Sequence, residues 1–212
     1  MLRFFPQPTL REEILERIMR LVSLYGLEDG DYLEFGVDQG KSFLAAYRMA
    51  ERHGLAKMRF YAFDSFQGLP EIRGIDREVP QFKPGQYATS QEQFLLNLRS
   101  AGVDLARVSV VPGWYHEILN AETKRKLPLR SAAVIWVDCD LYESTVPVLN
   151  FITDYVVDGT IIIFDDWFCF RGSPQRGEQR AFREWLAKHP EIGATEYYKH
   201  GFFGNSFVLH RN

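Results

Sequence analysis

Residues 132–166 read AAVIWVDCDLYESTVPVLNFITDYVVDGTIIIFDD, and a short apolar run stands near either end of this segment. The runs cover residues 132–137 and 160–164, are rich in Val and Ile, and are each followed by acidic residues. Runs of this length and composition are typical of strands buried on both faces of a parallel sheet. The residues between them are numerous enough for a crossover helix, so the segment predicts a strand–helix–strand unit.

Acidic residues follow both of these predicted strands. Asp138 and Asp140 come after the first, and Asp165 and Asp166 come after the second. In open α/β sheets, ligands bind at the carboxyl ends of the strands. Carboxylates gathered there repel one another unless a cation or a proton lies among them. The pattern favours an oxygen-ligand site for a Mg²⁺-type cation, and the simpler alternative is that these acids cap helices or face solvent.

Strand and helix patterns alternate through the rest of the chain. We expect strands at 31–36, 58–63 and 107–111, helices at 9–26, 41–52, 89–102, 115–126 and 179–188, and two late strands at 195–198 and 206–210. Capping-box patterns, Thr9 with Glu12 and Thr89 with Glu92, mark two of the helix starts. The alternation predicts an α/β fold: a Rossmann-like, doubly wound, mostly parallel sheet with an antiparallel C-terminal hairpin.

We interpret residues 1–212 as a single domain, because neither a linker nor an internal repeat is evident. Residues 1–29 read as an irregular arm followed by an amphipathic helix that covers the sheet or contacts a second subunit. Residues 65–89 contain several Gly and Pro and no clear periodicity. Loops of this length inside a domain are functional or disordered. A substrate lid and plain disorder both remain open for this loop.

Composition excludes several classes of protein. With 25% charged residues and a formal net charge of −3, the chain has no basic excess that would indicate nucleic-acid binding. No apolar run approaches the ~18 residues of a membrane span, and the N-terminus lacks the apolar core of a secretory signal. The two cysteines, Cys139 and Cys169, form no spaced framework. We therefore expect reduced thiols in a cytoplasmic protein without a membrane partner.

A glycine-bearing turn joins the predicted strand 31–36 to the helix that follows it. Gly36 and Gly40 let the backbone turn tightly and approach a ligand, but only three residues separate them, one fewer than a phosphate-binding P-loop requires. The G-x-G-x-x-G pattern preferred by NAD is absent as well. Two acids, Glu34 and Asp64, suit the ribose hydroxyls and the cationic groups of S-adenosylmethionine. A turn of this kind also occurs for packing reasons alone.

The third predicted strand ends in Gly113-Trp114-Tyr115, at the same edge of the sheet. An aromatic side chain in this place can stack on an adenine ring. It can equally close the hydrophobic core, and the residues themselves do not separate the two roles.

Five blocks together resemble one family. They are EFGVxxGxS at 34–42, FDSFQGLPE at 63–71, PGWY at 112–115, VDCDLYEST at 137–145 and IIIFDDW at 161–167. Their order resembles that of the macrocin O-methyltransferase (TylF-like) family, a metal-dependent branch of the class I S-adenosylmethionine methyltransferases. The resemblance covers roughly residues 30–185. It implies methylation of hydroxyls on sugars or aromatic groups of natural products.

The resemblance also implies a role for individual positions. Asp138, Asp165 and Asp166 fall where the family holds Mg²⁺. The other matching positions fall around the cofactor: Glu34, Gly36 and Ser42 in its first loop, Asp64 and Ser65 beside the ribose, and Trp114 near the adenine pocket.

Our hypothesis from the sequence is an O-methyltransferase that depends on Mg²⁺ or Mn²⁺. We expect its acceptor to be a small molecule with vicinal or catechol-like hydroxyls, and we expect the protein to form a homo-oligomer. The metal would lower the pKa of the acceptor hydroxyl. Asp138 is the first candidate for proton acceptor, followed by Asp140 and His116. Two alternatives are a DxD-type metal-dependent glycosyltransferase and a methyltransferase-like fold that binds a partner without turnover.

Overall fold

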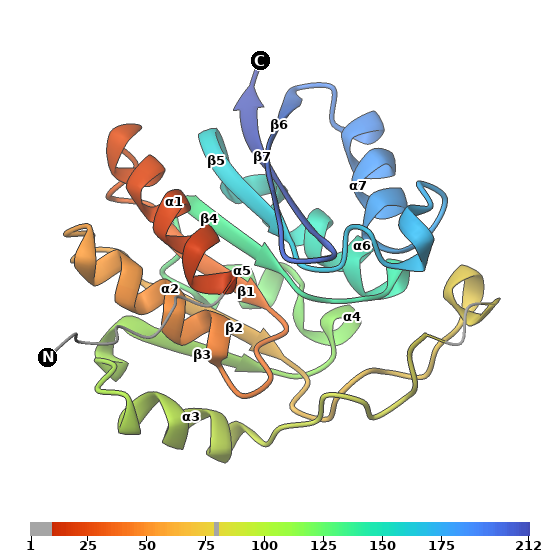
Figure 1. Ribbon diagram of the computed structural model, residues 1–212, viewed down its shortest axis with the longest axis horizontal. Helices are drawn as coiled ribbons and strands as arrows, with labels where there is room; N and C mark the ends of the chain where they lie inside the picture. The colour runs from red at the N-terminus through yellow and green to blue at the C-terminus, as the bar shows by residue number, and fades with distance from the viewer. Residues whose placement is uncertain (1–9, 79–80) are drawn as a thin grey trace, which may run out of the picture.

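The computed structural model describes residues 10–78 and 81–212. The strands within these ranges are β1 (Asp31–Phe35), β2 (Phe60–Asp64), β3 (Val108–Pro112), β4 (Ala132–Val137), β5 (Val156–Phe164), β6 (Ile192–His200) and β7 (Gly204–Arg211). They form one sheet in the order β3-β2-β1-β4-β5-β7-β6 (Figure 1). Strands β1 to β5 are parallel, whereas β7 pairs antiparallel with both β5 and β6. The predicted doubly wound sheet with an antiparallel C-terminal hairpin is confirmed.

Helices cover both faces of this sheet. They are α1 (Leu10–Leu24), α2 (Lys41–Arg52), α3 (Gln91–Ser100), α4 (Tyr115–Ile118), α5 (Ala121–Lys126), α6 (Tyr142–Ile152) and α7 (Gly177–Lys188). Side chains of α1, α2 and α3 pack on one face, and side chains of α4, α6 and α7 pack on the other. None of the helices in the described part of the chain is long and apolar enough to cross a bilayer.

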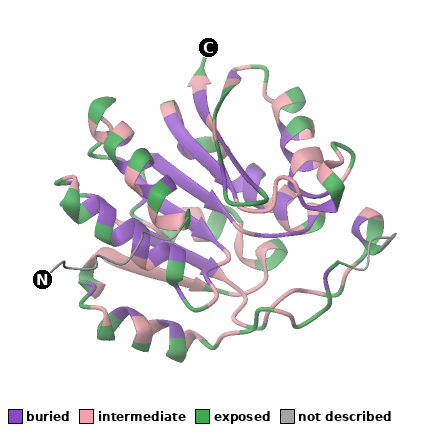
Figure 2. Ribbon diagram, viewed as in Figure 1, coloured by how far each residue is buried: buried purple, intermediate pink, exposed green. Residues whose placement is uncertain are grey.

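The apolar runs of the central strands are continuous because both faces of the sheet are covered. In β4, Val134 and Trp136 join the core under α1 and α2, whereas Ile135 and Val137 join the core under α6 and α7. Successive side chains of a strand point to opposite faces, so each run supplies both cores alternately. Figure 2 shows the result, with the strands in the buried centre and exposure concentrated on the outer helices and the long loop.

Helix α1 is amphipathic, as the sequence predicted. Its buried residues are Ile14, Leu15, Ile18, Met19 and Val22, which recur at helical spacing and face the sheet. The predicted capping residue Thr9 lies outside the described residues.

Two predictions about helix starts and lengths were wrong. Helix α3 is capped by Ser90, whose hydroxyl accepts the backbone N–H of Gln93, while Thr89 donates its hydroxyl to Asp38 instead. The helix predicted at 115–126 is divided into α4 and α5. Asn120 separates them, because its side-chain oxygen accepts the N–H groups of residues 122 and 123 and so starts a new helix.

Candidate active site

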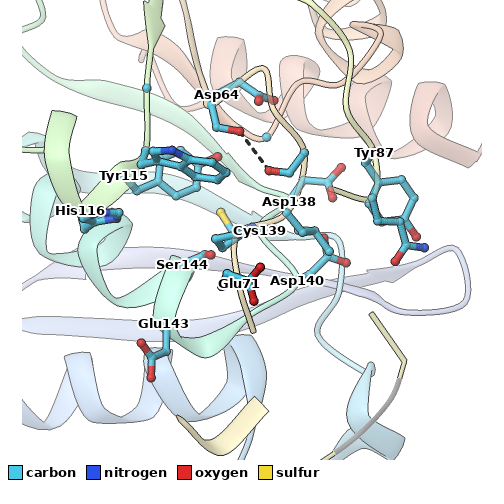
Figure 3. A pocket seen from close by; sticks show the side chains of 18 of the residues that line it. Asp64, Glu71, Tyr87, Tyr115, His116, Asp138, Cys139, Asp140, Glu143 and Ser144 are labelled. Atoms are coloured by element: carbon cyan, nitrogen blue, oxygen red, sulfur yellow. Dashed lines mark hydrogen bonds between the residues drawn. The ribbon is translucent and has the colours of Figure 1, made fainter. Parts of the chain in front are cut away.

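The candidate site lies at the carboxyl ends of the parallel strands. Strands β1 and β4 are neighbours, and the chain winds outward from them in opposite directions, which is the switch point where open α/β sheets bind ligands. A cavity of about 690 Å³ opens there (Figure 3). Its lining includes the residues that follow four strands: Gly36 after β1, Asp64 at the end of β2, Trp114 after β3, and Asp138 and Asp140 after β4.

The turn after β1 requires a glycine at its first position. Gly36 has φ +89°, and a Cβ built there would lie 2.0 Å from the carbonyl oxygen of Asp138. A side chain at this position is therefore excluded both by conformation and by space. The close approach of the two loops puts the acids after β4 next to the glycine turn. Gly40, the other predicted glycine, has φ +82° and forms the N-cap of α2.

Asp64 organises the backbone on the cofactor side of the cavity. One of its oxygens accepts the N–H groups of Val37 (2.7 Å) and Asp38 (3.3 Å), and the other accepts the N–H of Phe66 (2.7 Å). Burial raises the pKa of Asp64, against the effect of these hydrogen bonds. Asp64 and Ser65 both line the cavity, as a cofactor-binding role requires. The oxygen that accepts only the N–H of Phe66 can still accept a further hydrogen bond from a ligand.

Glu34 and Ser42 lie in the core beneath this turn. The Ser42 hydroxyl donates to one oxygen of Glu34 at 2.6 Å, and the Tyr32 hydroxyl donates to the other. Burial raises the pKa of Glu34 to about 7 in spite of these donors. The two predicted cofactor residues thus satisfy each other, and their contact with a cofactor stays a prediction.

Trp114 and His116 line the cavity on the side of α4. Trp114 immediately precedes that helix. The side chain of His116 is 73% exposed and lies 3.7 Å from Glu117. Figure 3 places His116 beside Tyr115, on the opposite side of the cavity from Asp140. A proton acceptor in that place would serve an acceptor molecule bound near α4 rather than one bound at the acids.

Three aspartates meet at the other side of the cavity. Asp138, Asp140 and Asp166 each offer an oxygen, and these oxygens all lie within 4.8 Å of one another. Asp140 is buried and has φ +58°, a conformation that residues other than glycine seldom adopt. The Leu141 N–H donates to the Cys139 carbonyl at 2.6 Å across this turn. Backbone strain of this kind tends to occur at functional sites, where the surrounding structure enforces it.

Asp165 does not lie with these three carboxylates, although the sequence placed it in the metal set together with Asp138 and Asp166. Its Oδ2 accepts a hydrogen bond of 2.6 Å from Arg11 of α1, and its Oδ1 lies 3.6 Å from the Nε2 of His200. Burial raises the pKa of Asp165, but His200 and Arg11 outweigh that effect and leave the pKa below its usual value. The acids whose oxygens lie within 4.8 Å of one another are thus Asp138, Asp140 and Asp166, and the role of Asp165 as a metal ligand stays a prediction.

The group of Asp138, Asp140 and Asp166 has the chemistry of a cation site. Burial and the neighbouring carboxylates raise the pKa of Asp138 and Asp140 well above the usual range, and raise that of Asp166 to about 6. The Oδ2 of Asp166 is buried and has no donor among the described residues. A divalent cation would satisfy this oxygen and reverse the direction of these pKa shifts. Hard carboxylate oxygens are ligands that suit Mg²⁺ and Mn²⁺.

Glu178, which the sequence analysis did not assign, lies behind this group. It is 1% exposed, and its Oε2 accepts the backbone N–H of Asp166 at 3.1 Å. Burial and the nearby aspartates raise its pKa well above the usual value. Glu178 thus holds the backbone of Asp166 from behind the three carboxylates.

The loop at 65–89 covers the acidic side of the cavity. Its middle contacts the chain after β5: the Gln81 amide donates to Cys169 Sγ at 3.3 Å and accepts the N–H of Phe170 at 3.1 Å. Asp76 is 1% exposed and lies at the start of α6, where its Oδ2 is 3.5 Å from the N–H of Glu143. Tyr87, with φ +64°, lines the cavity beside Asp138 and Asp140 (Figure 3). The loop is therefore docked at several points, as a lid requires.

Of the site residues that sequence reasoning missed, Tyr87 had a local signal, because it is an aromatic residue within a polar loop. Arg11 had none, since its contacts with Asp138 and Asp165 span 127 and 154 positions in the sequence. Both cysteines are free and buried, which agrees with the expectation of reduced thiols.

Comparison with known proteins identifies relatives over most of the chain. A profile of the family described as macrocin-O-methyltransferase (TylF) matches residues 10–189. The 8-demethyl-8-(2,3-dimethoxy-alpha-L-rhamnosyl)-tetracenomycin-C 4'-O-methyltransferase of Streptomyces olivaceus is 32% identical over 143 residues, which cover 65% of this chain and 53% of that protein. The demethyldecarbamoylnovobiocin O-methyltransferase of Streptomyces niveus is 29% identical with the same coverage. The chain thus spans about half the length of the curated relatives it matches.

Solved structures show the same architecture. The O-methyltransferase NovP superposes with a TM-score of 0.78 and 24% identity, covering 95% of this chain and 80% of that one. At this level of identity the likeness concerns the fold.

Proposed function

Because the chain belongs to the macrocin-O-methyltransferase (TylF) family, we propose that it transfers the methyl group of S-adenosylmethionine to a hydroxyl oxygen of a sugar or another natural product. One observation supports this most: a single cavity is lined both by the cofactor-type residues Gly36, Asp64 and Trp114 and by the acids Asp138 and Asp140. A methyl donor and an acceptor held in one cavity react as neighbours, which can supply ~7–11 kcal/mol of the barrier.

The proposed acceptor is a sugar hydroxyl with a second hydroxyl beside it. The Streptomyces olivaceus relative is named for a rhamnosyl tetracenomycin, and a glycoside of this kind presents vicinal oxygens. Two neighbouring oxygens suit a site built from carboxylates around a cation, because both can enter one coordination sphere.

The proposed cation, Mg²⁺ or Mn²⁺, is held by Asp138, Asp140 and Asp166. When bound, it lowers the pKa of the acceptor hydroxyl. The carboxylate of Asp138 or Asp140 then accepts the hydroxyl proton, while a carbon–oxygen bond forms to the methyl group and the carbon–sulfur bond breaks. The products are the methyl ether and S-adenosylhomocysteine. Asp138 suits both tasks, because it belongs to the acidic group and also lines the cavity.

The loop at 65–89 acts in this proposal as a lid of one catalytic domain. Two observations support this role: Asp76 and Gln81 contact the rest of the domain, and Tyr87 lies beside Asp138 and Asp140 in the cavity (Figure 3). A closed lid excludes water, which strengthens the electrostatic interactions between the acids and an acceptor.

Thermal unfolding with added ligands tests the cofactor. S-adenosylhomocysteine should raise the melting temperature by mass action, whereas UDP-glucose should leave it unchanged. The opposite result would support the glycosyltransferase alternative. Methyl transfer from labelled S-adenosylmethionine to glycosides with vicinal hydroxyls, with and without EDTA, tests the reaction. Transfer that is unaffected by EDTA would remove the cation from the proposal.

A further inference from the structure

Tyr87 of the loop at 65–89 presents an aromatic ring inside the cavity. It lines the cavity together with Asp138 and Asp140, and 56% of the residue is exposed. Figure 3 shows it beside these two acids and across the cavity from Tyr115 and His116. Aromatic side chains in a cavity supply apolar contact area to the molecule that binds there. Tyr87 therefore borders the acidic part of the cavity, where the acceptor is proposed to bind.

The backbone before Tyr87 is fixed against the beginning of the same loop. The Leu69 N–H donates to the Gln86 carbonyl at 2.9 Å, and the Gly85 N–H donates to the Leu69 carbonyl at 2.8 Å. Gly68 permits this approach, because a Cβ added to it would lie 2.5 Å from the Gln86 carbonyl oxygen. The two ends of the loop are thus joined immediately before Tyr87.

The backbone after Tyr87 is attached to the glycine turn that follows β1. The Thr89 hydroxyl donates to Asp38, whose own N–H donates to Asp64. Between these two attachments Tyr87 has φ +64°, a conformation that is costly for a residue with a bulky side chain. The contacts on both sides therefore enforce one backbone conformation at Tyr87, which restricts the rotamers of its ring.

The acids and the ring offer two different surfaces to one acceptor molecule. Asp138 and Asp140 suit hydroxyl groups, whereas the face of the Tyr87 ring suits C–H groups. A pyranose ring carries its hydroxyls around the edge and presents C–H groups on its faces. A sugar that directs two vicinal hydroxyls to the acids can therefore lay a C–H face on Tyr87.

We propose that Tyr87 is a specificity-determining residue that binds the C–H face of a pyranose ring while the acids hold the vicinal hydroxyls of the same sugar. This proposal rests on the proposed function, because it assumes a glycoside acceptor in this cavity. Its consequence is a preference for cyclic sugars over open-chain polyols that carry similar hydroxyls. The contact is made by the ring and does not require the Tyr87 hydroxyl.

Saturation-transfer NMR tests the proposal without turnover, in the presence of saturating S-adenosylhomocysteine and Mg²⁺. The probes are methyl α-L-rhamnopyranoside and L-rhamnitol, an open-chain polyol that has vicinal hydroxyls but no ring face. Tyr87→Ala should weaken binding of the rhamnoside at least about tenfold, and that of rhamnitol about twofold or less, because the lost contact is apolar area against the ring. Tyr87→Phe should bind both probes as the parent protein does.

Two further variants make the comparison specific. Tyr87→Asn removes the ring but tolerates a positive φ, so it should repeat the result of Tyr87→Ala even if alanine disturbs the loop. Tyr197→Ala is the matched control, because Tyr197 lies on β6, is 39% exposed and stands outside the cavity lining. It should leave both affinities unchanged. Isothermal titration should give the same affinity for S-adenosylhomocysteine in all of these variants.

Each other outcome overturns the proposal. Rhamnoside binding that is equal in the parent and in both ring-deleted variants would contradict it and leave the proposed methyl transfer standing. A loss in Tyr87→Phe as large as that in Tyr87→Ala would assign the contact to the hydroxyl, and weaker S-adenosylhomocysteine binding in Tyr87→Ala would place the ring against the cofactor. A parent protein that binds S-adenosylhomocysteine but neither probe would remove the glycoside acceptor together with this role of Tyr87.

Discussion

Asp165 and Asp166 follow the same strand one after the other, but their carboxylates lie in opposite electrostatic surroundings. Asp165 faces Arg11 of α1 and His200 of β6, and its pKa is lowered. Asp166 faces Asp140, with Glu178 of α7 behind it, and its pKa is raised to about 6. On one side the protein supplies the counter-charge itself. On the other side Asp140 and Asp166 lie together with Asp138, which also contacts Arg11 at 3.4 Å.

The alternation of side chains along β5 explains the difference. Ile163 belongs to the core under α1 and α2, and Phe164 belongs to the core under α6 and α7. The same alternation continues into the two aspartates, so Asp165 turns towards α1 and Asp166 turns towards α7. Two adjacent acids at a strand end therefore lie in different electrostatic surroundings, however similar they look in the sequence.

The largest expected effect is the contrast between Asp166→Asn and Asp165→Asn. Because polarisation by a metal is worth several kcal/mol, Asp166→Asn should lower methyl transfer at least about 1000-fold in the presence of Mg²⁺. Asp165→Asn should lower the rate of methyl transfer much less, since Asp165 is paired with Arg11. Initial rates measure both effects, and titration with S-adenosylhomocysteine should show unchanged affinity. Equal losses in the two variants would return Asp165 to the ligand set.

A second change acts on the backbone that positions Asp138. Gly36→Ala should lower the free energy of unfolding by about 3–4 kcal/mol, because the new Cβ meets the Asp138 carbonyl and φ is positive. The matched control is Gly85→Ala, where φ is also positive but no atom lies within 4 Å of the added Cβ. It should cost only about 1 kcal/mol. Denaturant unfolding compares the two, and similar losses would show that space at Gly36 is not limiting.

Glu34 is a third case for this comparison: it is buried and accepts hydrogen bonds from two hydroxyls, and none of the residues that the structure describes forms an ion pair with it. Burial raises its pKa to about 7, above the ordinary value of 4.5. Between these two pKa values the folded state holds a proton that the unfolded state has released. The free energy of unfolding therefore falls as the pH rises from about 4.5 to about 7. Above this window Glu34 adds no further change. Glu34→Gln should remove this slope, which amounts to at most about 3 kcal/mol.

Urea unfolding of the parent and of Glu34→Gln across this pH window, in EDTA, measures the slope. Glu28→Gln, at an exposed glutamate, serves as the control. Identical pH profiles for the parent and Glu34→Gln would show that Glu34 is ionised in the folded state throughout.

The smallest effect concerns the loop that covers the acids. Asp76 lies at the start of α6. The N-cap residue of this helix, Leu141, makes no side-chain hydrogen bond to it. Asp76→Asn should weaken this contact by about 1 kcal/mol, because a charge at a helix N-terminus is lost. Limited proteolysis should then cut the loop at 65–89 faster than in the parent. Asp29→Asn, at an exposed position, should leave the rate unchanged, and an unchanged rate for Asp76→Asn as well would show that the loop is docked by other contacts.

Much of the fold could be predicted because its signals are local. The helix expected at 41–52 and the strand expected at 132–137 have the predicted bounds. Predictions were weaker where competing polar side chains decide a helix start, as at Ser90 and Asn120. At the site, the gathering of acids and the glycine turn followed from strand order. The sequence did not indicate which acids lie closest together, because Asp140 reaches Asp138 and Asp166 through a turn with positive φ.

The amino-acid sequence by itself determined the strand–helix alternation, the parallel sheet, and the edge where the glycine turn and the aspartates meet. These features depend on periodicity and on residues adjacent in the chain. Only the tertiary structure decided the charge balance among the acids. Arg11 reaches Asp165 across 154 positions because α1 packs on the sheet, and no local pattern encodes that contact. Electrostatic partners depend on distance in space, so only the folded chain shows that Arg11 contacts Asp165 and Asp138, while Asp140 and Asp166 lie close to each other.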